Sequence, residues 1–213
     1  MITRILGLAL FASLASPAFA QAAPPPLPAP APTPKEDLVP VAIDTSAGRI
    51  VITLDRGHAP ISTANFLHYV DTHRFDGETF YRAMHQQDAN GVDGGLIQGG
   101  ITSNALKLFP PIKHEPTTQT GLHNVAGSIA MANAGPGTAR ADFFILVSDL
   151  PGLDANGPGG DANGFAVFGH VTDGMDVVKK IFSSPLSPTK GKGALKGQML
   201  DPALKIIKVS RIK

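Results

Sequence analysis

Cysteine is absent from the 213-residue sequence, which excludes disulfides, Cys-ligated zinc or iron–sulfur sites and a thiol nucleophile. An excess of charge is absent too, since 18 Lys and Arg stand against 17 Asp and Glu, for a formal net charge of +1. Because no basic stripe interrupts this balance, the electrostatic footprint of a nucleic-acid-binding protein is missing. We therefore expect no nucleic-acid partner.

Common catalytic motifs are also missing. The seven histidines form neither an HExxH motif nor an i, i+4 pair, so no metal site is predicted. No GxSxG motif marks a serine nucleophile, and the glycine-rich stretch 157–160 lacks the Lys of a phosphate-binding loop. The string DANG occurs at 88–91, 154–157 and 161–164, but without EF-hand spacing it indicates turns rather than calcium sites. The sequence thus predicts neither a metal nor a cofactor.

The first residues lack a hydrophobic run long enough to span a membrane. The apolar stretch 5–15 is shorter than the ~20 residues that a membrane-spanning helix needs. Arg4 precedes this stretch and the small-residue pattern AFA at 18–20 follows it, which is typical of a secretory signal peptide. We predict a signal peptide over residues 1–20 with cleavage after Ala20, a periplasmic protein and no stable membrane insertion. An uncleaved interfacial helix is less favoured because the stretch has no charged face.

Residues 21–40 differ in composition from the rest of the chain. Prolines are concentrated there, and they favour extended polyproline II over packed structure. We interpret this segment as a linker; a proline-rich ligand for another protein is the weaker alternative, because such strings arise freely in low-complexity sequence. The remaining residues, 41–213, are expected to form one folded domain, in keeping with 43% hydrophobic and 16% charged residues in the chain.

The hydrophobic pattern of this domain predicts mainly β structure. Strands are expected at 41–46, 49–54, 79–83, 96–98, 128–132, 143–147, 166–171 and 204–212, and helices from Pro60 to a point before Gly77 and at 175–182. Eight short strands without strand–helix alternation favour a closed antiparallel barrel, because closure removes exposed sheet edges. A β-sandwich is the alternative.

A set of short strings occurs in a fixed order along the domain. They are Phe80-Tyr81-Arg82, LIQGG at 96–100, GSIAMANAG at 127–135, Phe143-Phe144-Ile145, FAVFG at 165–169 and Gly174-Met175. Together these strings resemble the cyclophilin family of peptidyl-prolyl cis/trans isomerases, over roughly residues 41–213. The resemblance implies an eight-stranded antiparallel barrel capped by two α-helices, with a peptide groove on its outer face.

The resemblance also implies roles for individual residues. Arg82 matches the arginine that points its guanidinium at the substrate proline. Gln98, its expected neighbour and the second catalytic residue, matches a residue that holds the flanking peptide backbone. The remaining substrate-binding positions implied are the proline pocket of Leu96, Phe144 and Leu153, the backbone-binding Ala132 and Asn133, and the groove residues Asp142 and Phe165.

Three positions depart from the family pattern. Gly95 stands where the family usually has a pocket Phe, and Gly152 lies near the position of a Trp, so a shallower pocket is expected. Asp142 replaces a neutral Gln. If the match holds, its carboxylate should pair with the Arg82 guanidinium or with a substrate backbone N–H, and the opposite charge should lower its pKa.

The implied chemistry suits these residue types. Rotation about an amide bond faces a barrier of ~18–20 kcal/mol, because the nitrogen lone pair is delocalised, and X-Pro bonds isomerise slowly unaided. An enzyme needs only to stabilise the twisted state, in which the prolyl nitrogen accepts a hydrogen bond from a fixed guanidinium. We expect a monomer that acts on proline-containing unfolded or extended polypeptides without a cofactor.

Two other functions remain open at this stage. A non-catalytic module of the same fold would hold proline-containing segments as a chaperone. A small-molecule carrier barrel is less favoured, because bulky Ile, Leu, Val and Phe side chains are predicted to fill the interior.

Overall fold

The structure, a computed structural model, describes residues 37–87 and 90–213. The predicted signal peptide, 1–20, and linker residues 21–36 lie outside the described residues. The folded domain begins with strand β1 at Leu38, slightly earlier than the expected start at residue 41. Pro40 is compatible with this strand because φ near −65° is close to the extended region.

The described residues contain the predicted elements, one additional short strand, one additional short helix and three 3-10 turns. The strands are β1 (Leu38–Thr45), β2 (Gly48–Asp55), β3 (Thr79–Gln87), β4 (Asp93–Gly100), β5 (Ser128–Met131), β6 (Phe143–Leu146), β7 (Val167–Asp173), β8 (Leu186–Ser187) and β9 (Met199–Arg211). The helices are α1 (Pro60–Asp71), α2 (Thr117–Thr120) and α3 (Met175–Phe182), with 3-10 turns η1 (Ala105–Lys107), η2 (Pro151–Leu153) and η3 (Gly193–Leu195). Strand β8 and helix α2 were not predicted, because two to four residues are too few to show a hydrophobic period.

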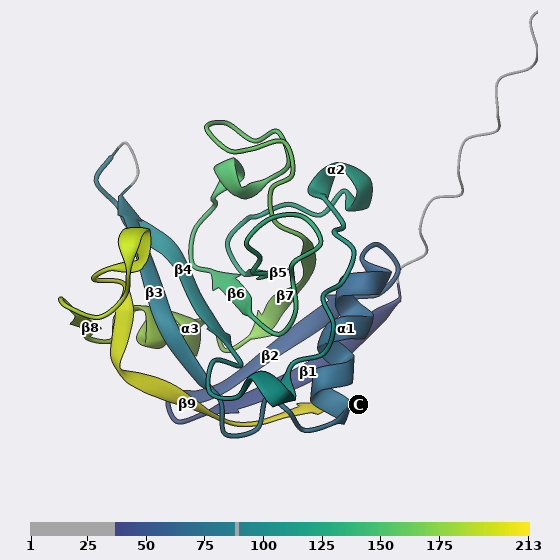
Figure 1. The fold of residues 1–213 in the computed structure, drawn as a ribbon, viewed down its shortest axis with the longest axis horizontal. Coiled ribbons are helices and arrows are strands. Elements are labelled where there is room, and N and C mark those ends of the chain that lie inside the picture. Colours follow the sequence, from purple (N-terminus) through teal and green to yellow (C-terminus); the bar gives the residue numbers. More distant parts are fainter. Residues whose placement is uncertain (1–36, 88–89) are drawn as a thin grey trace, which may run out of the picture. The chain divides into compact units, whose positions relative to one another are not determined.

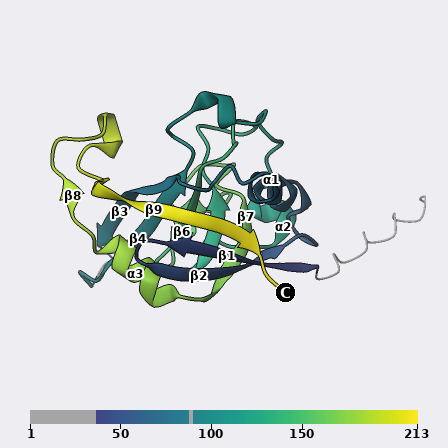
Figure 2. The ribbon, with the colours of Figure 1, turned by 90° about the horizontal axis from the view of Figure 1, so that it is seen from below.

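One antiparallel sheet contains all the described strands. Its order is β1-β2-β7-β5-β6-β4-β3-β9-β8, and β1 also pairs with β9. This last pairing closes a ring of eight strands among the described residues, while β8 is joined to the ring through β9. The closed eight-stranded barrel is therefore confirmed over the sandwich, and Figures 1 and 2 show β9 running beside β1.

Aromatic side chains fill the interior of the barrel. Phe143 is fully buried, and the rings of Phe66, Phe75 and Phe80 meet it edge-on at centroid distances of 5.3, 5.5 and 5.7 Å. Such pairs add about 0.5–1.5 kcal/mol each to the free energy gained from burial. A barrel filled in this way has no interior space for a carried ligand, so the carrier alternative is not supported.

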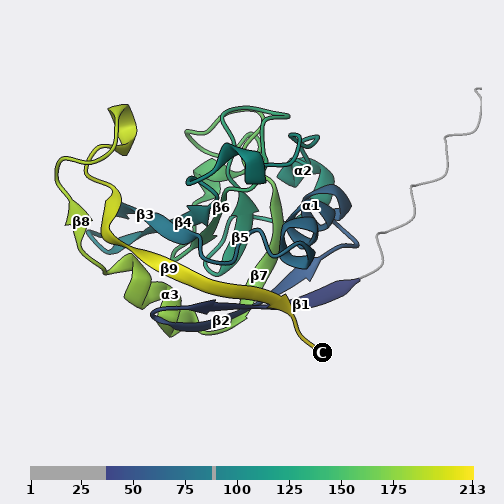
Figure 3. The ribbon, with the colours of Figure 1, turned by 60° about the horizontal axis from the view of Figure 1, so that its bottom comes forward.

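Helices α1 and α3 pack against the barrel at different places. Helix α1 contacts β2, β7 and β9, and α3 contacts β2, β3 and β4. Figure 3 shows the two helices well apart from each other. These are the two capping helices that the resemblance implied. Helix α3 packs Val178 and Ile181, both fully buried, into the main core. No helix in the described residues is long and apolar enough to cross a membrane.

A remote carboxylate caps the first turn of α1. The residue at the helix start, Ala59, offers no side-chain acceptor. Glu115, only 1% exposed, accepts the Ile61 N–H at 3.0 Å and both the N–H and the hydroxyl of Ser62 at 2.7 Å. It satisfies donors that have no partner within the helix and places a negative charge at the positive end of the helix dipole.

We expect Glu115→Ala to lower the free energy of unfolding by about 2–4 kcal/mol, because three buried donors lose their acceptor. Urea denaturation followed by circular dichroism measures this change. Asp176→Ala is the control, since Asp176 is a carboxylate within the first turn of helix α3 and is exposed, and it should cost less than about 1 kcal/mol. Equal losses in the two variants would show that Glu115 is not a buried cap.

Candidate functional site

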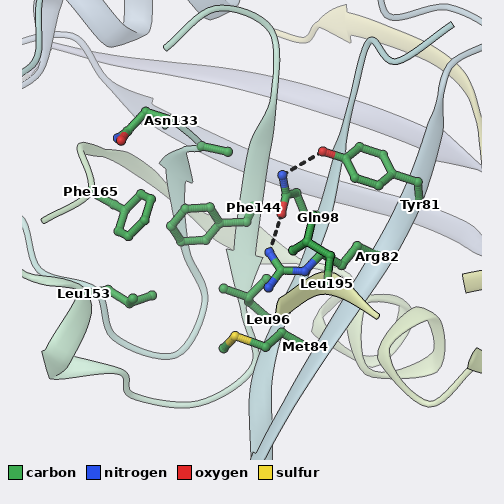
Figure 4. A pocket seen from close by; sticks show the side chains of 11 residues that line it. Tyr81, Arg82, Met84, Leu96, Gln98, Asn133, Phe144, Leu153, Phe165 and Leu195 are labelled. Atoms are coloured by element: carbon green, nitrogen blue, oxygen red, sulfur yellow. Dashed lines mark hydrogen bonds between the residues drawn. The ribbon is translucent and has the colours of Figure 1, made fainter. Parts of the chain in front are cut away.

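A groove of about 290 Å³ lies on the outer face of the barrel. Its lining comes from β3, β4 and β6 and from the segments around β5, η2, β7 and η3 (Figure 4). The lining residues are Tyr81, Arg82, Met84, Leu96, Gln98, Ala132, Asn133, Phe144, Leu153, Phe165 and Leu195. The groove therefore has two walls. The polar wall contains Tyr81, Arg82 and Gln98, and the apolar wall contains Leu96, Phe144 and Phe165.

A β-bulge places the polar wall on the outside of the barrel. Phe80 pairs with Gly99 and Arg82 pairs with Gln98, so Tyr81 is the extra residue on β3. Residues i and i+2 of a regular strand share a face, and Phe80 is fully buried in the barrel interior. Without the bulge Arg82 would point into the same core. The extra residue reverses the alternation and turns both Tyr81 and Arg82 toward the groove.

Regular alternation positions the apolar wall. On β4, Leu96 and Gln98 face the groove while Ile97 faces the core, and on β6 Phe144 faces the groove. The Phe144 ring meets the Phe165 ring edge-on at 5.3 Å. Leu96 and Phe144 belong to a second, smaller hydrophobic cluster separate from the core, and Phe165 packs against this cluster. A compact apolar group such as a proline ring is suited to this wall.

Arg82 is held between two neutral amides. Its Nη1 donates to Gln98 Oε1 at 2.6 Å and its Nε donates to Gln198 Oε1 at 2.8 Å. Gln98 Nε2 in turn donates to the Tyr81 hydroxyl at 2.6 Å. Burial lowers the pKa of Arg82 from its usual value and raises that of Tyr81. The guanidinium nevertheless keeps its charge at neutral pH, because an arginine pKa lies far above 7.

Eight of the nine predicted site residues line this groove. They are Arg82, Leu96, Gln98, Ala132, Asn133, Phe144, Leu153 and Phe165. The expected contact between Arg82 and Gln98 is present. Asn133 Nδ2 is buried and has no hydrogen-bond partner among the described residues. The individual roles of these residues stay predictions.

Asp142 is the exception, and its expected pairing with Arg82 is wrong. It lines a neighbouring cavity of about 370 Å³ rather than the groove. Its Oδ1 is buried without a hydrogen-bond partner in the described part of the chain and packs against Gly100, where an added Cβ would lie 2.1 Å from it. Burial raises the Asp142 pKa to about 6, and the Tyr81 hydroxyl and the Ile101 N–H offset this only in part. The expectation of a lowered pKa failed because it assumed a solvated carboxylate beside a cation.

The family's pocket Phe cannot be accommodated at Gly95. The glycine has φ +141°, and an added Cβ would lie 1.8 Å from the carbonyl oxygen of Met84. Met84, which pairs with Leu96 across the two strands, lines the groove instead. Met84 on β3 therefore adds an apolar side chain to a groove that has no ring at position 95.

Sequence reasoning missed four residues at this site: Tyr81, Met84, Leu195 and Gln198. Tyr81 and Met84 are close to Arg82 in sequence, but whether their side chains face the groove depends on the β-bulge. No glycine in this strand indicated a bulge in the sequence. Leu195 and Gln198 come from the connection between β8 and β9, and no motif linked that segment to Arg82. Only tertiary structure brings them to the groove.

The chain is similar to known proteins over most of its length. Residues 40–209 match the family model described as cyclophilin type peptidyl-prolyl cis-trans isomerase/CLD. The chain is 38% identical over 145 residues to peptidyl-prolyl cis-trans isomerase A of Dickeya dadantii, a match that covers 66% of this chain and 70% of that protein. It is also 38% identical over 144 residues to peptidyl-prolyl cis-trans isomerase B of Escherichia coli, covering 66% of this chain and 82% of that protein.

Solved structures share the fold at lower identity. A crystal structure of a Cryptosporidium parvum cyclophilin type peptidyl-prolyl cis-trans isomerase superposes with a TM-score of 0.62 and 19% identity, covering 83% of this chain and 99% of that one. A second crystal structure of that protein, in the presence of the dipeptide Ala-Pro, also gives a TM-score of 0.62, with 20% identity and coverage of 82% and 99%. At this identity the likeness concerns the fold alone.

We expect Asp142→Asn to stabilise the protein above pH 7. The folded-state pKa of about 6 lies above the ordinary value of 3.8, so burial of the charged form destabilises the wild type by about 3 kcal/mol at pH 7–8. The advantage of the variant should shrink as pH falls through 6 and vanish below about 4, where Asp142 is protonated in both states. Urea denaturation of both proteins between pH 4 and 8 measures the difference.

The exposed Asp176→Asn serves as the control for removing a carboxylate. A difference between wild type and Asp142→Asn that does not change with pH would contradict a buried, titrating Asp142.

Proposed function

The chain belongs to the cyclophilin-type peptidyl-prolyl cis-trans isomerases, and from this premise we propose that it accelerates rotation about X-Pro bonds in exported proteins while they fold. The protein is an isomerase, like the curated relatives it matches. The substrates we propose are unfolded or extended polypeptides that contain proline. The non-catalytic binding module is therefore not retained as the main function.

The observation that carries this mechanism is the position of one cation at the edge of an apolar pocket. Leu96, Phe144 and Phe165 offer a wall for the proline ring, and Arg82 lies beside it with its plane held by two amides. When the X-Pro amide twists, its nitrogen becomes pyramidal and regains a lone pair that accepts a hydrogen bond. The planar amide has no such acceptor, so the interaction strengthens only toward the transition state.

The groove anchors one side of the rotating bond and leaves the other side free. Burying the ring in the apolar wall fixes the prolyl part of the substrate, while the residue before proline turns. The Arg82 guanidinium has N–H groups left after its two bonds to glutamine, and these are the donors for the prolyl nitrogen. Arg82 is half-buried, so the effective dielectric around it is lower than in bulk water, which strengthens the interaction.

We propose in addition that the protein is exported to the periplasm and acts there as a monomer. The support for export is the signal-like pattern at residues 1–20, with AFA at 18–20, and the proline-rich composition that follows it. The support for a monomer is that residues of a single chain complete the groove.

We expect Arg82→Ala to lower kcat/KM by about 10²–10³-fold, because the lost donor acts mainly in the transition state. Stability should change little, since Arg82 lies at the groove and not in the core. A proline-limited refolding assay at catalytic enzyme concentration measures the activity. Arg56→Ala, which removes an exposed arginine of a surface ion pair, is the control. Wild-type activity in Arg82→Ala would refute the mechanism.

We expect the mature protein to begin at Gln21. Small residues at 18 and 20 suit signal peptidase, and Ala20→Phe should block cleavage and leave precursor in the membrane fraction. Mass spectrometry of the periplasmic fraction, with the full-length gene expressed in a Gram-negative host, tests this. Detection of periplasmic protein that still carries Met1 would contradict cleavage, and protein found only in the cytoplasm would contradict export.

A further inference from the structure

The connection before β9 reaches the groove from a distant part of the sequence. Gln198 ends this connection, and its carbonyl oxygen accepts the Ala83 N–H at 3.0 Å. The next residue, Met199, pairs with Arg82 across β3 and β9. Backbone pairing therefore holds Gln198 directly beside Arg82, and Figure 1 shows the β8–β9 connection alongside β3.

Gln198 and Gln98 hold different nitrogens of the same guanidinium. Gln198 Oε1 accepts from Nε of Arg82 at 2.8 Å, and Gln98 Oε1 accepts from Nη1 at 2.6 Å. A guanidinium is planar, so two contacts at separate nitrogens determine both its position and its plane. With only one of these hydrogen bonds, the guanidinium could rotate about the bond that remained.

A further contact fixes the orientation of the Gln198 amide. Its Nε2 donates to the carbonyl oxygen of Ala194, in η3, at 2.9 Å, so the opposite end, Oε1, faces Arg82. Gln98 is oriented in the same manner by its bond to the Tyr81 hydroxyl. Each glutamine is thus held with its acceptor toward the cation.

Both partners of Arg82 are neutral. Among the described residues Arg82 has no ion pair, although Asp142 lies in the neighbouring cavity. A carboxylate in place of either amide would hold the guanidinium as firmly, but it would cancel much of the positive potential at the prolyl nitrogen. Two amides orient the cation and leave its charge available.

We propose that Gln198 is a positioning residue of the isomerase, which fixes the Arg82 guanidinium from the side opposite Gln98 without neutralising it. This inference rests on the proposed function. It assigns to the β8–β9 connection a part in the reaction, through Arg82 rather than through contact with substrate.

The test compares two substitutions at position 198. Gln198→Met keeps the length of the side chain and removes the acceptor, so kcat should fall about tenfold while KM changes less than about twofold. Gln198→Glu keeps an acceptor but adds a charge, so kcat should also fall, by a similar factor. Gln119→Met and Gln119→Glu are matched controls at an exposed glutamine of α2, and they should retain wild-type kcat.

A spectroscopic readout separates positioning from a structural role. In NMR spectra of the wild type the Arg82 Nε–H should exchange slowly with solvent, because it is bonded to Gln198. The exchange should become faster in Gln198→Met and stay slow in Gln198→Glu, whose acceptor is retained. Slow exchange together with reduced kcat in Gln198→Glu would support the requirement for a neutral partner.

Several results would overturn the inference. Wild-type kcat in Gln198→Met would show that Gln198 does not act by positioning Arg82. A reduced kcat in Gln198→Met with Nε–H exchange as slow as in the wild type would show the same. Fast exchange in the wild type would show the same, even if Gln198→Met failed to fold. Wild-type kcat in Gln198→Glu would overturn the requirement for a neutral partner. An inactive wild type with slow exchange would instead refute the proposed function and leave the contact itself intact.

Discussion

The pairing of β1 with β9 closes the sheet, and the location of the groove depends on that closure. A closed barrel gives every strand one face toward a shared interior and one face toward the outside. The interior is filled by aromatic rings around Phe143, which leaves no room for a substrate. Chemistry is therefore confined to the outer face, where β3, β4 and β6 present Arg82, Gln98 and Phe144.

One irregularity in this barrel makes the site possible. Strict alternation would send Arg82 into the core beside Phe80, where an unpaired charge is very costly. The extra residue at Tyr81 avoids that cost and adds a hydroxyl that orients Gln98. The apolar wall needs no β-bulge, because Leu96 and Phe144 lie at regular outward-facing positions of their strands.

The site divides the work of binding and catalysis between its two walls. In the mechanism that we propose, apolar contacts hold the ring of the substrate, and a single cation acts on the nitrogen as the bond twists. Neutral glutamines orient that cation, while the carboxyl group of Asp142 is kept apart from it in a desolvated position where its pKa is raised to about 6. The positive potential in the groove therefore comes from Arg82 itself.

Local patterns in the sequence determined the elements and most of the groove. Alternation predicted the main strands and the spacing from Pro60 predicted α1, because these signals lie within a few neighbouring positions. The short strings between Phe80 and Met175 indicated the family, and the resemblance implied the eight groove residues. Tertiary structure alone decided the bulge at Tyr81, the burial of Asp142 and the approach of Gln198 to Arg82. Each of these depends on which strands become neighbours and on how much water they exclude, and neither property is contained in a short stretch of sequence.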